Sequence, residues 1–335
     1  MSPRRSGAEA QVVELGDIRK TFVVRRPQPD ARGLDRLKRK RMEVHAVDGV
    51  SLSVGAGEMV GYVGPNGAGK STTVKMLTGI LVPSSGRIRV LGLEPSRQRV
   101  ELAKRIGVVF GQRTQLWWDL PLRDSFELLR HIYRVPEDRY AKNLDAFTSI
   151  LELGPFLDTP VRQLSLGQRM RGDLAAALLH DPEILFLDEP TIGLDVVAKA
   201  SIREFLAERN RDRGTTVLLT THDMDDIERL CRRMLIIDHG HVIYDGDLDT
   251  VKRRFGAETV LVVDLVEPGP PLDVAGARVT KVDGPRQWLT FRRDEVTASD
   301  LIATVAARAQ IRDLALEDPA IEDVVRRIYT EGIDS

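Results

Sequence analysis

Eight residues, GPNGAGKS from Gly64 to Ser71, match the spacing G-x-x-x-x-G-K-[ST]. The apolar run EMVGYVG precedes them and the helix-forming stretch STTVKMLTGIL follows, so the glycines fall between a predicted strand and a predicted helix. Glycines let successive backbone N–H groups curl around phosphate oxygens at the positive end of a helix. The Lys70 ammonium has the length to reach the outer phosphates, and the Ser71 hydroxyl suits Mg²⁺. The pattern predicts a phosphate-binding loop.

Two adjacent acids end a short apolar run further along the chain. The stretch ILFLDEP places Asp188 at the end of a predicted strand and Glu189 directly after it. Ligands of open α/β sheets bind at the carboxyl ends of strands, so both acids are expected in one crevice with the phosphate loop. Asp188 is suited to hold Mg²⁺, and Glu189 to polarise an attacking water as a general base. The alternative is a charged strand end that turns at Pro190.

Two other polar residues also follow apolar runs. His222 comes after TTVLLTT, and Gln112 comes after VVFG. A lone histidine is usually a structural residue, and a lone glutamine carries no functional signal. These two residues indicate chemistry only as a set with the phosphate loop and the two acids.

The stretch LSLGQRMRGDLAAALL, residues 164–179, allows two interpretations. Ser165 and Gln168 have the spacing of a capping box, which is an ordinary way to begin a helix. A capping box does not need Gly167, however, and an uncovered helix N-terminus also favours an anion. The stretch therefore predicts a helix start, a second phosphate-binding surface, or both.

The elements that would position these residues alternate between strand and helix patterns from about residue 47 to 245. This alternation predicts an α/β domain over residues 1–250 with a largely parallel sheet. A mostly helical block is expected beside the sheet as a subdomain at about 113–175. Beyond about residue 254 the pattern changes, and residues 255–335 are expected to form a small strand-rich α+β domain.

Composition restricts the class of protein. Lys and Arg nearly balance Asp and Glu over the 335 residues, with a net charge of −1, which argues against a general affinity for nucleic acid. The single cysteine, Cys231, excludes an internal disulfide framework. No window approaches eighteen apolar residues, so any role at a membrane is expected to depend on a partner.

The set of motifs resembles the nucleotide-binding subunit of ATP-binding cassette (ABC) transporters. The matching pieces stand in that family's order over roughly residues 11–250. They are GPNGAGKST, Gln112, LSLGQ, ILFLDEP, the GLD of 193–195 and the TTHD of 220–223. The resemblance implies a P-loop NTPase core with a mixed sheet and a helical subdomain, with ATP and Mg²⁺ as cofactors.

The resemblance also implies roles for individual residues. Those implied in catalysis are Glu189, His222, Lys70 and Gln112, and those implied in holding Mg²⁺ are Ser71, Gln112 and Asp188. The implied ATP-binding residues are Phe22, Gly64, Pro65, Asn66, Gly67, Ala68, Gly69, Lys70, Ser71, Thr72, Ser165, Gly167 and Gln168. Phe22 would stack on adenine, although its strand-like setting also suits a core residue.

Two chains of such a family enclose two ATP molecules head to tail, as a homodimer or a heterodimer. In that arrangement Ser165 and Gly167 contact the γ-phosphate held by the opposite chain, and Asp195 lies at the seam. One departure from the family pattern is Leu166, which replaces the first glycine of L-S-G-G-Q. We expect a working but slower site, because the leucine affects how closely this backbone approaches the nucleotide.

The function expected from the resemblance is ATP hydrolysis that powers solute export through a separate integral-membrane permease. The chain would then lie peripherally on the cytoplasmic face of the membrane. Export rather than import rests on the resemblance alone. The alternatives are an importer ATPase, or an ABC ATPase that acts on ribosomes or DNA without a membrane partner. Co-purification of a polytopic membrane protein, or of rRNA or DNA, distinguishes these classes.

Three segments carry weaker signals. Trp117 and Trp118 in QLWWDLP are expected to border the groove for the permease, or else to anchor the helical block by packing. The basic segment Arg25 to Met42 is expected to be an extended loop or a short hairpin. It is solvated, in contact with acidic lipid headgroups, or in contact with nucleic acid. The C-terminal domain dimerises, regulates or only braces the fold.

Overall fold

The computed structural model describes residues 10–27, 39–111, 113–255, 259–292, 295–317 and 321–331. The chain divides into two compact units, Met1–Asp245 and Gly246–Ser335. This division lies five residues before the boundary at 250 taken from the sequence. Gln112 and most of the basic segment fall outside the described residues.

A six-stranded sheet carries the chemical motifs of the first unit. Its strand order is β5 (Ile106–Phe110), β6 (Ile184–Asp188), β7 (Thr216–Thr220), β3 (Met59–Val63), β8 (Arg233–Asp238) and β9 (His241–Asp247). The first five strands pair in parallel. Only His239 and Gly240 connect β8 to β9, and both have positive φ, which is the backbone of a tight hairpin turn. The predicted α/β fold with a mixed sheet is therefore confirmed.

A second, antiparallel sheet of the first unit was not predicted. It has the order β2 (Arg39–Gly55), β1 (Gln11–Pro27) and β4 (Ser85–Val90). Its buried side chains, such as Val13, Ile18 and Val50, share one hydrophobic core with Tyr62 and Phe186 of the larger sheet. The two ends of the basic segment are paired strands, since Arg25 lies opposite Arg41.

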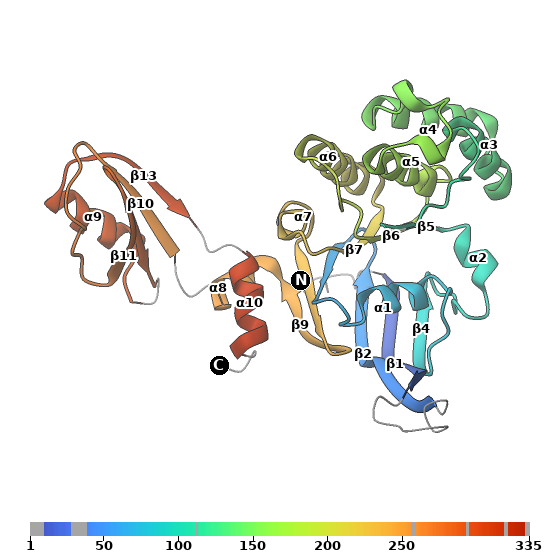
Figure 1. The fold of residues 1–335 in the computed structure, drawn as a ribbon, viewed down its shortest axis with the longest axis horizontal. Helices are drawn as coiled ribbons and strands as arrows, with labels where there is room; N and C mark the ends of the chain where they lie inside the picture. Colours follow the sequence, from blue (N-terminus) through green and yellow to red (C-terminus); the bar gives the residue numbers. More distant parts are fainter. Residues whose placement is uncertain are drawn as a thin grey trace, which may run out of the picture. The chain divides into compact units, whose positions relative to one another are not determined.

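Helices cover the larger sheet and form the predicted helical block (Figure 1). The first unit has α1 (Lys70–Leu77), α2 (Arg99–Ala103), α3 (Leu122–Tyr133), α4 (Glu137–Ile150), α5 (Leu166–Leu178), α6 (Val196–Arg213) and α7 (Met224–Leu230). Short 3₁₀ turns at Gly154–Phe156 and Val161–Gln163 lead into α5. Figure 1 shows α3, α4 and α5 gathered together, away from β1, β2 and β4. Buried residues along α5, including Ala175 and Ala176, pack toward β5.

The second unit has its own antiparallel sheet and core. Its strands follow the order β11 (Ala277–Asp283), β12 (Arg286–Phe291), β10 (Thr259–Leu265) and β13 (Ile311–Glu317). Its helices are α8 (Leu248–Phe255), α9 (Ala298–Arg308) and α10 (Ile321–Glu331). Leu301 and Val305 of α9 pack with Leu261, Leu289 and Phe291 of the sheet. This core is separate from the core of the first unit.

Two properties of the described residues concern membrane crossing and thiol chemistry. None of their helices combines the length and the apolar character needed to cross a bilayer. Cys231, at the end of α7, is 5% exposed, and burial raises the pKa of its thiol to about 12. The thiol is therefore protonated and shielded at neutral pH.

Candidate active site

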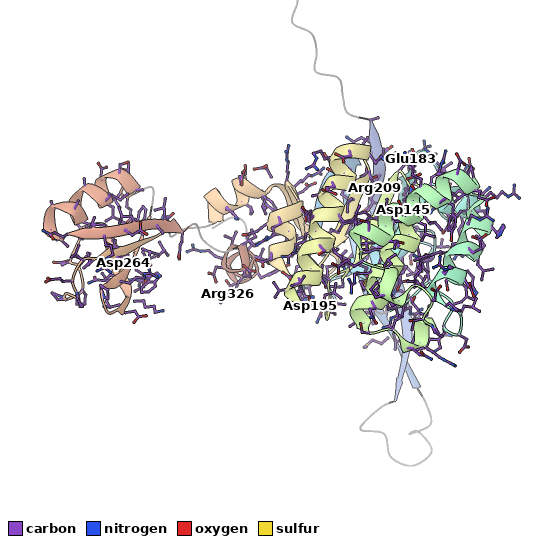
Figure 2. All side chains as sticks on the ribbon, turned by 90° about the horizontal axis from the view of Figure 1, so that it is seen from above. Asp145, Glu183, Asp195, Arg209, Asp264 and Arg326 are labelled. Carbon is purple, nitrogen blue, oxygen red and sulfur yellow. The ribbon has the colours of Figure 1, made fainter. Side chains whose placement is uncertain are left out.

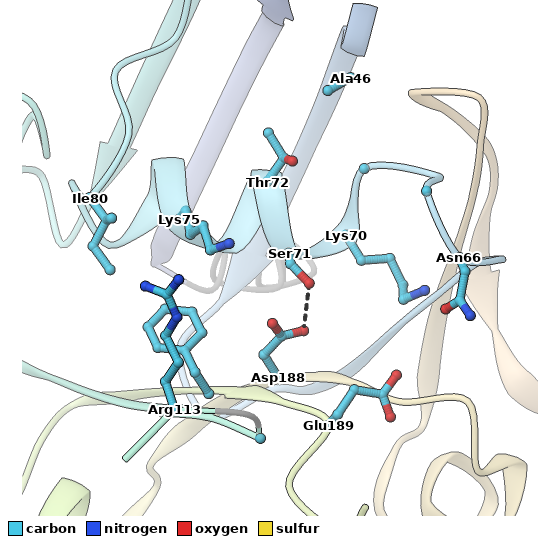
Figure 3. Close-up of a pocket in the computed structure, with 14 residues that line it drawn as sticks. Ala46, Asn66, Lys70, Ser71, Thr72, Lys75, Ile80, Arg113, Asp188 and Glu189 are labelled. Atoms are coloured by element: carbon cyan, nitrogen blue, oxygen red, sulfur yellow. Dashed lines mark hydrogen bonds between the residues drawn. The ribbon is translucent and has the colours of Figure 1, made fainter. Parts of the chain in front are cut away.

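A cavity of about 440 Å³ opens where the phosphate loop meets the carboxyl ends of β5 and β6. Figure 3 shows Lys70 and Ser71 on one side of it and Asp188 and Glu189 on the other. Its lining comprises Ala46, Asn66, Gly67, Gly69, Lys70, Ser71, Thr72, Lys75, Ile80, Phe110, Gly111, Arg113, Asp188 and Glu189. Residues far apart in sequence thus meet at the sheet edge where α/β folds bind ligands.

The phosphate loop curves around the Lys70 side chain. The Lys70 Nζ donates to the carbonyl oxygens of Gly64, at 2.5 Å, and Pro65, at 3.1 Å. Burial lowers the pKa of Lys70, and the negative charges of Glu189 and Asp188 oppose that shift. Gly69 has a φ of +110°, and a Cβ there would overlap the carbonyl oxygen of Ala46. A glycine is therefore required at the residue that leads into α1.

The carboxylate of Asp188 is 9% exposed and is held by two hydroxyl groups. Its Oδ1 accepts from the Ser71 Oγ at 3.1 Å and from the Thr220 Oγ1 at 2.5 Å. Thr220 ends β7, the strand next to β6, so the parallel register brings its hydroxyl to this carboxylate. Carboxylate and hydroxyl oxygens are hard donors of the kind that Mg²⁺ prefers, so the residues present fit that ion.

Glu189 and His222 form a close pair at the mouth of the cavity. Glu189 has a φ of +57°, and its backbone N–H donates to the Thr220 carbonyl at 2.9 Å. Its Oε2 lies 2.6 Å from the Nδ1 of His222. An ionised carboxylate can only accept, so Nδ1 carries the hydrogen and the ring is oriented by Glu189. A non-glycine residue in the left-handed region is a feature that occurs often at functional sites.

Phe22 lies outside the cavity lining but on the hairpin that forms one of its walls. It pairs with Val44, two residues before Ala46, which lines the cavity. Ala46 is skipped at an irregularity in the pairing of β1 with β2, because Lys20 pairs with Val47 and Thr21 with His45. Phe22 is 36% exposed, which does not fit a core residue. The Lys20 Nζ lies over its ring, 5.3 Å from the ring centre.

The capping box that the sequence predicted at the start of α5 is present. The Ser165 N–H donates to the Gln168 Oε1 at 2.9 Å, and the Gln168 N–H donates to the Ser165 Oγ at 3.2 Å. Ser165 is exposed, and Ser165, Gly167 and Gln168 do not line the cavity described above. The start of α5 is therefore open toward solvent and does not complete the phosphate site of its own chain.

Two residues that the sequence motifs do not indicate also lie at the site. Lys75 and Arg113 line the cavity on the side away from Lys70 (Figure 3). Lys75 follows Ser71 by one helical turn, a spacing that places both on one face of α1 and could have revealed it. Arg113 directly follows Gln112, which lies outside the described residues. Neither residue belongs to a motif, so motif spacing alone did not select them.

A buried carboxylate joins α5 to the segment after residue 112. The Asp173 Oδ1 accepts from the Thr114 Oγ1 at 2.9 Å and from the Gln115 N–H at 3.0 Å. The Gln115 Nε2 donates back to the Asp173 carbonyl at 3.1 Å. Burial raises the pKa of Asp173 to about 6, and the two donors and the charge of Arg169 oppose that shift.

An ionic network connects α6, the helix after Glu189, with α7, the helix after His222. Asp226 is fully buried and accepts from the Arg203 Nε and the Thr191 Oγ1, each at 2.5 Å. The Lys199 Nζ donates to the Asp223 carboxylate at 2.5 Å. Asp223 directly follows His222, so α6 fixes the backbone that presents the imidazole. Asp195 caps α6 by accepting from the Ala198 N–H at 2.8 Å (Figure 2).

Comparison with known proteins places the chain in a family. The family model described as ABC transporter matches residues 47–192. The ABC transporter ATP-binding protein NatA of Bacillus subtilis (strain 168) is 34% identical over 216 residues, which cover 64% of this chain and 87% of that protein. A daunorubicin resistance ATP-binding protein of Streptomyces coeruleorubidus is 33% identical over 296 residues, which cover 87% of this chain and 93% of that protein.

Solved structures agree with the sequence comparisons. A dimeric ATP-binding cassette in a post-hydrolysis state with ADP and Pi has a TM-score of 0.59 at 27% identity, covering 70% of this chain and 98% of that one. The ATP binding subunit of an ABC transporter has a TM-score of 0.61 at 26% identity, covering 73% of this chain and 93% of that one. With its cavity, acids and motif order on the same fold, the chain belongs to the ABC transporter family and is an ATP-binding ATPase subunit.

Proposed function

We propose that this ATPase hydrolyses ATP at two sites shared between two chains and thereby powers solute export through a separate permease. The observation that carries the proposal is the Glu189–His222 pair beside the phosphate cavity, together with a helix start at Ser165 that the same chain leaves open. The phosphate cavity and the start of α5 would each supply one half of a complete site, because the start of α5 does not line the cavity of its own chain.

In this proposal the residues of the cavity bind ATP and activate the attacking water. The backbone N–H groups of the phosphate loop and the Lys70 ammonium hold the phosphates, which requires Lys70 to leave the carbonyls of Gly64 and Pro65. The Glu189 carboxylate accepts a proton from the attacking water. His222 holds that carboxylate in place. Phe22 stacks on the adenine ring.

Ser71 and Asp188 would hold Mg²⁺, with Gln112 as a further ligand outside the described residues. When bound, the ion supplies positive charge that offsets the charge on the phosphate oxygens. The chain contributes the Ser71 hydroxyl and the Asp188 carboxylate, which are hydrogen-bonded to each other. The Thr220 hydroxyl donates to the same carboxylate and holds it in place.

The second half of each site would come from the opposite chain. The N-terminus of α5, with Ser165, Gly167 and Gln168, presents free N–H groups that favour an anion. We infer that this surface contacts the γ-phosphate held by the partner, with Asp195 at the seam. A capping box and a phosphate contact are compatible, because the cap uses only some of the N–H groups at the helix start.

Export is proposed from the names of similar proteins. One is a daunorubicin resistance ATP-binding protein, and a Nod factor export ATP-binding protein of Paraburkholderia xenovorans (strain LB400) is 39% identical over 216 residues, covering 69% of that protein. The ATPase would lie on the cytoplasmic face of the membrane, held by its permease. Residues 1–250 would form the ATPase domain, with a helical subdomain at about 113–175, and residues 255–335 the accessory domain.

The test is purification of the full chain from its native host by an affinity tag after mild detergent extraction. We expect the purified chain to hydrolyse ATP in a Mg²⁺-dependent manner. We also expect a polytopic membrane protein to co-purify with the tagged chain, and to be missing from the same purification when the tagged chain is absent. Co-purification of rRNA or DNA in place of a membrane protein would contradict the proposal.

A further inference from the structure

The side chain of Leu166 lies over a glycine of another segment. Leu166 is the first residue of α5 and stands where the family signature has glycine. A Cβ built on Gly193, which has a φ of +70°, would overlap the Leu166 Cδ2. Leu166 is 38% exposed, so one side of it rests on Gly193 and the other faces outward. Glycine at 166 could not make this contact.

A second contact joins the same two segments, and here the turn supplies the leucine and α5 supplies the glycine. A Cβ built on Gly167 would lie 3.3 Å from the Leu194 Cδ2. Leu194 is 9% exposed and is therefore largely covered. Each segment thus contributes one leucine and one glycine, and each leucine packs on the other segment's glycine. We name this set of four residues, Leu166, Gly167, Gly193 and Leu194, the leucine clasp.

The leucine clasp connects two parts of the proposed chemistry. Its α5 side begins next to Ser165. Its other side lies in a tight turn, in which the Ile192 N–H donates to the Glu189 carbonyl at 3.4 Å and the Leu194 N–H donates to the Thr191 carbonyl at 3.2 Å. The same turn ends at Asp195, the cap of α6. The clasp thus joins the start of α5 to the turn that follows Glu189.

We propose that Leu166 is a positioning residue, which ties the phosphate-contacting start of α5 to the Glu189 turn of the same chain so that the two move as one body. This inference rests on the proposed function of Ser165 and Glu189. Apolar contacts between two segments restrict their relative motion, since separating them exposes apolar surface to water. The α5 start that faces the partner's nucleotide and the turn beside the chain's own base thereby keep a fixed spacing.

The test measures ATP hydrolysis of the full-length chain in three variants, Leu166→Gly, Leu194→Ala and the double variant. We expect each single variant to lower kcat about fivefold while KM for ATP changes less than about twofold, because the phosphate loop is untouched. The double variant should be no slower than either single one, since the loss of either contact already lets the two segments move apart. Leu166→Met, of similar volume, should retain most of the wild-type kcat.

Glycine at the first position of a helix has a cost of its own, which needs a control. Glu137 is the exposed first residue of α4 and lies outside the cavity lining, so Glu137→Gly imposes the same backbone change away from the site. It should leave kcat unchanged. If Leu166→Gly does not fold, Leu166→Ala removes the same contact without the glycine backbone.

Hydrogen exchange supplies a readout that does not depend on hydrolysis. Peptides that span residues 190–196 should exchange faster in Leu166→Gly than in the wild type, and no faster in Glu137→Gly. Unchanged exchange, additive losses of kcat, or faster exchange without a loss of kcat would each overturn the positioning role. An inactive wild-type chain that still shows the exchange difference would instead refute the proposed function and leave the clasp intact as a structural contact.

Discussion

The Glu189 carboxylate carries the proposed proton transfer, and Glu189→Gln tests it directly. The amide keeps the size of the side chain and a hydrogen-bond acceptor for His222, but it cannot take a proton from water. We expect ATP binding close to that of the wild type and a fall in turnover of about 100-fold or more, the range of general base catalysis. Nucleotide binding and steady-state ATPase assays measure both quantities.

Lys70→Ala is the matched comparison for Glu189→Gln. It removes the ammonium from the phosphate loop, so nucleotide binding itself should be lost. If Glu189→Gln weakened ATP binding as severely as Lys70→Ala, Glu189 would have a role in holding the nucleotide and not only in chemistry.

Asp173 offers a prediction about pH. Its folded pKa of about 6 lies above the ordinary value near 4, so between these pH values the folded state binds more protons than the unfolded state. The free energy of unfolding should therefore decrease as pH rises from 4 to 6, by up to about 3 kcal/mol for two pKa units. Asp173→Asn retains an Oδ1 that can accept from Thr114 and Gln115 and should remove this pH dependence. Thermal melts at pH 4.5 and pH 8 measure it.

The same substitution has an outcome that would refute the burial argument. Asp173→Asn should be as stable as the wild type or more stable at pH 8, because no charge is then buried. A strong loss of stability at pH 8 would show that the carboxylate charge is needed, with Arg169 as the partner that the charge attracts.

At the scale of single residues, the sequence predicts the site residues that lie within motifs well and the residues beside them poorly. Lys70, Ser71 and Asp188 fall within motifs whose spacing determines their chemistry, and the structure brings them to one cavity. Arg113 could not be selected, because its place at the site depends on the antiparallel bridge between Phe110 and Arg113. Thr220 lies within the TTHD motif, but its hydrogen bond to Asp188 depends on the pairing of β7 with β6. Their roles, like those of the motif residues, stay predictions until tested.

Among the elements, the segment between β5 and α3 carries two exposed tryptophans. Trp117 is 37% exposed and Trp118 is 50% exposed, and the Arg169 guanidinium of α5 lies 5.5 Å from the Trp118 ring. Large aromatic side chains on a surface often dominate binding to a partner. We expect the double variant Trp117→Ala with Trp118→Ala to fold normally and to bind its permease at least about tenfold more weakly. Affinity capture of the permease and a thermal melt measure the two properties.

A control for this pair is Val100→Ala on α2, since Val100 is also apolar and 74% exposed. It should change neither binding nor stability. An insoluble double tryptophan variant, or one that melts at a much lower temperature, would instead favour the role of a packing anchor for the helical block.

The elements themselves were predicted unevenly, for physical reasons. The strands β3, β6 and β7 are short, continuously apolar runs because both faces of the parallel sheet are buried, and such runs stand out in sequence. The antiparallel sheet of β1, β2 and β4 is exposed on part of its surface, and β1 and β2 contain irregularities at several positions. Bulges interrupt the alternation of apolar and polar residues by which such strands are recognised.

At the scale of the assembled molecule, two differently damaged chains should restore each other's activity. Ser165→Arg blocks the start of α5 but leaves the phosphate loop, and Lys70→Ala does the reverse. In a mixed dimer the intact Lys70 of one chain faces the intact Ser165 of the other. Random mixing makes about half of the dimers mixed, so about a quarter of all sites are whole if each site acts locally. ATP turnover of the mixture should exceed that of either variant alone.

A second mixture serves as the control for the first. Lys70→Ala and Glu189→Gln damage the same cavity, so no mixed dimer of these two variants contains a whole site, and mixing should restore nothing. ATP-dependent dimerisation of the Ser165→Arg and Lys70→Ala mixture, measured by light scattering, covers the case in which both sites must act together. If neither turnover nor dimerisation appears, the start of α5 is only a helix cap and the shared-site proposal fails.

The buried Cys231 makes the chain a ready background for site-directed labelling. It is the single cysteine of the sequence, and burial holds its thiol in the unreactive protonated form. Maleimide or nitroxide reagents should therefore leave the native chain unmodified. A cysteine introduced at an exposed position, such as Ile132 on α3 or Val100 on α2, would be the one reactive thiol in each copy. Spin-label or fluorescence distances between two copies could then follow closure during turnover, without first replacing a native residue.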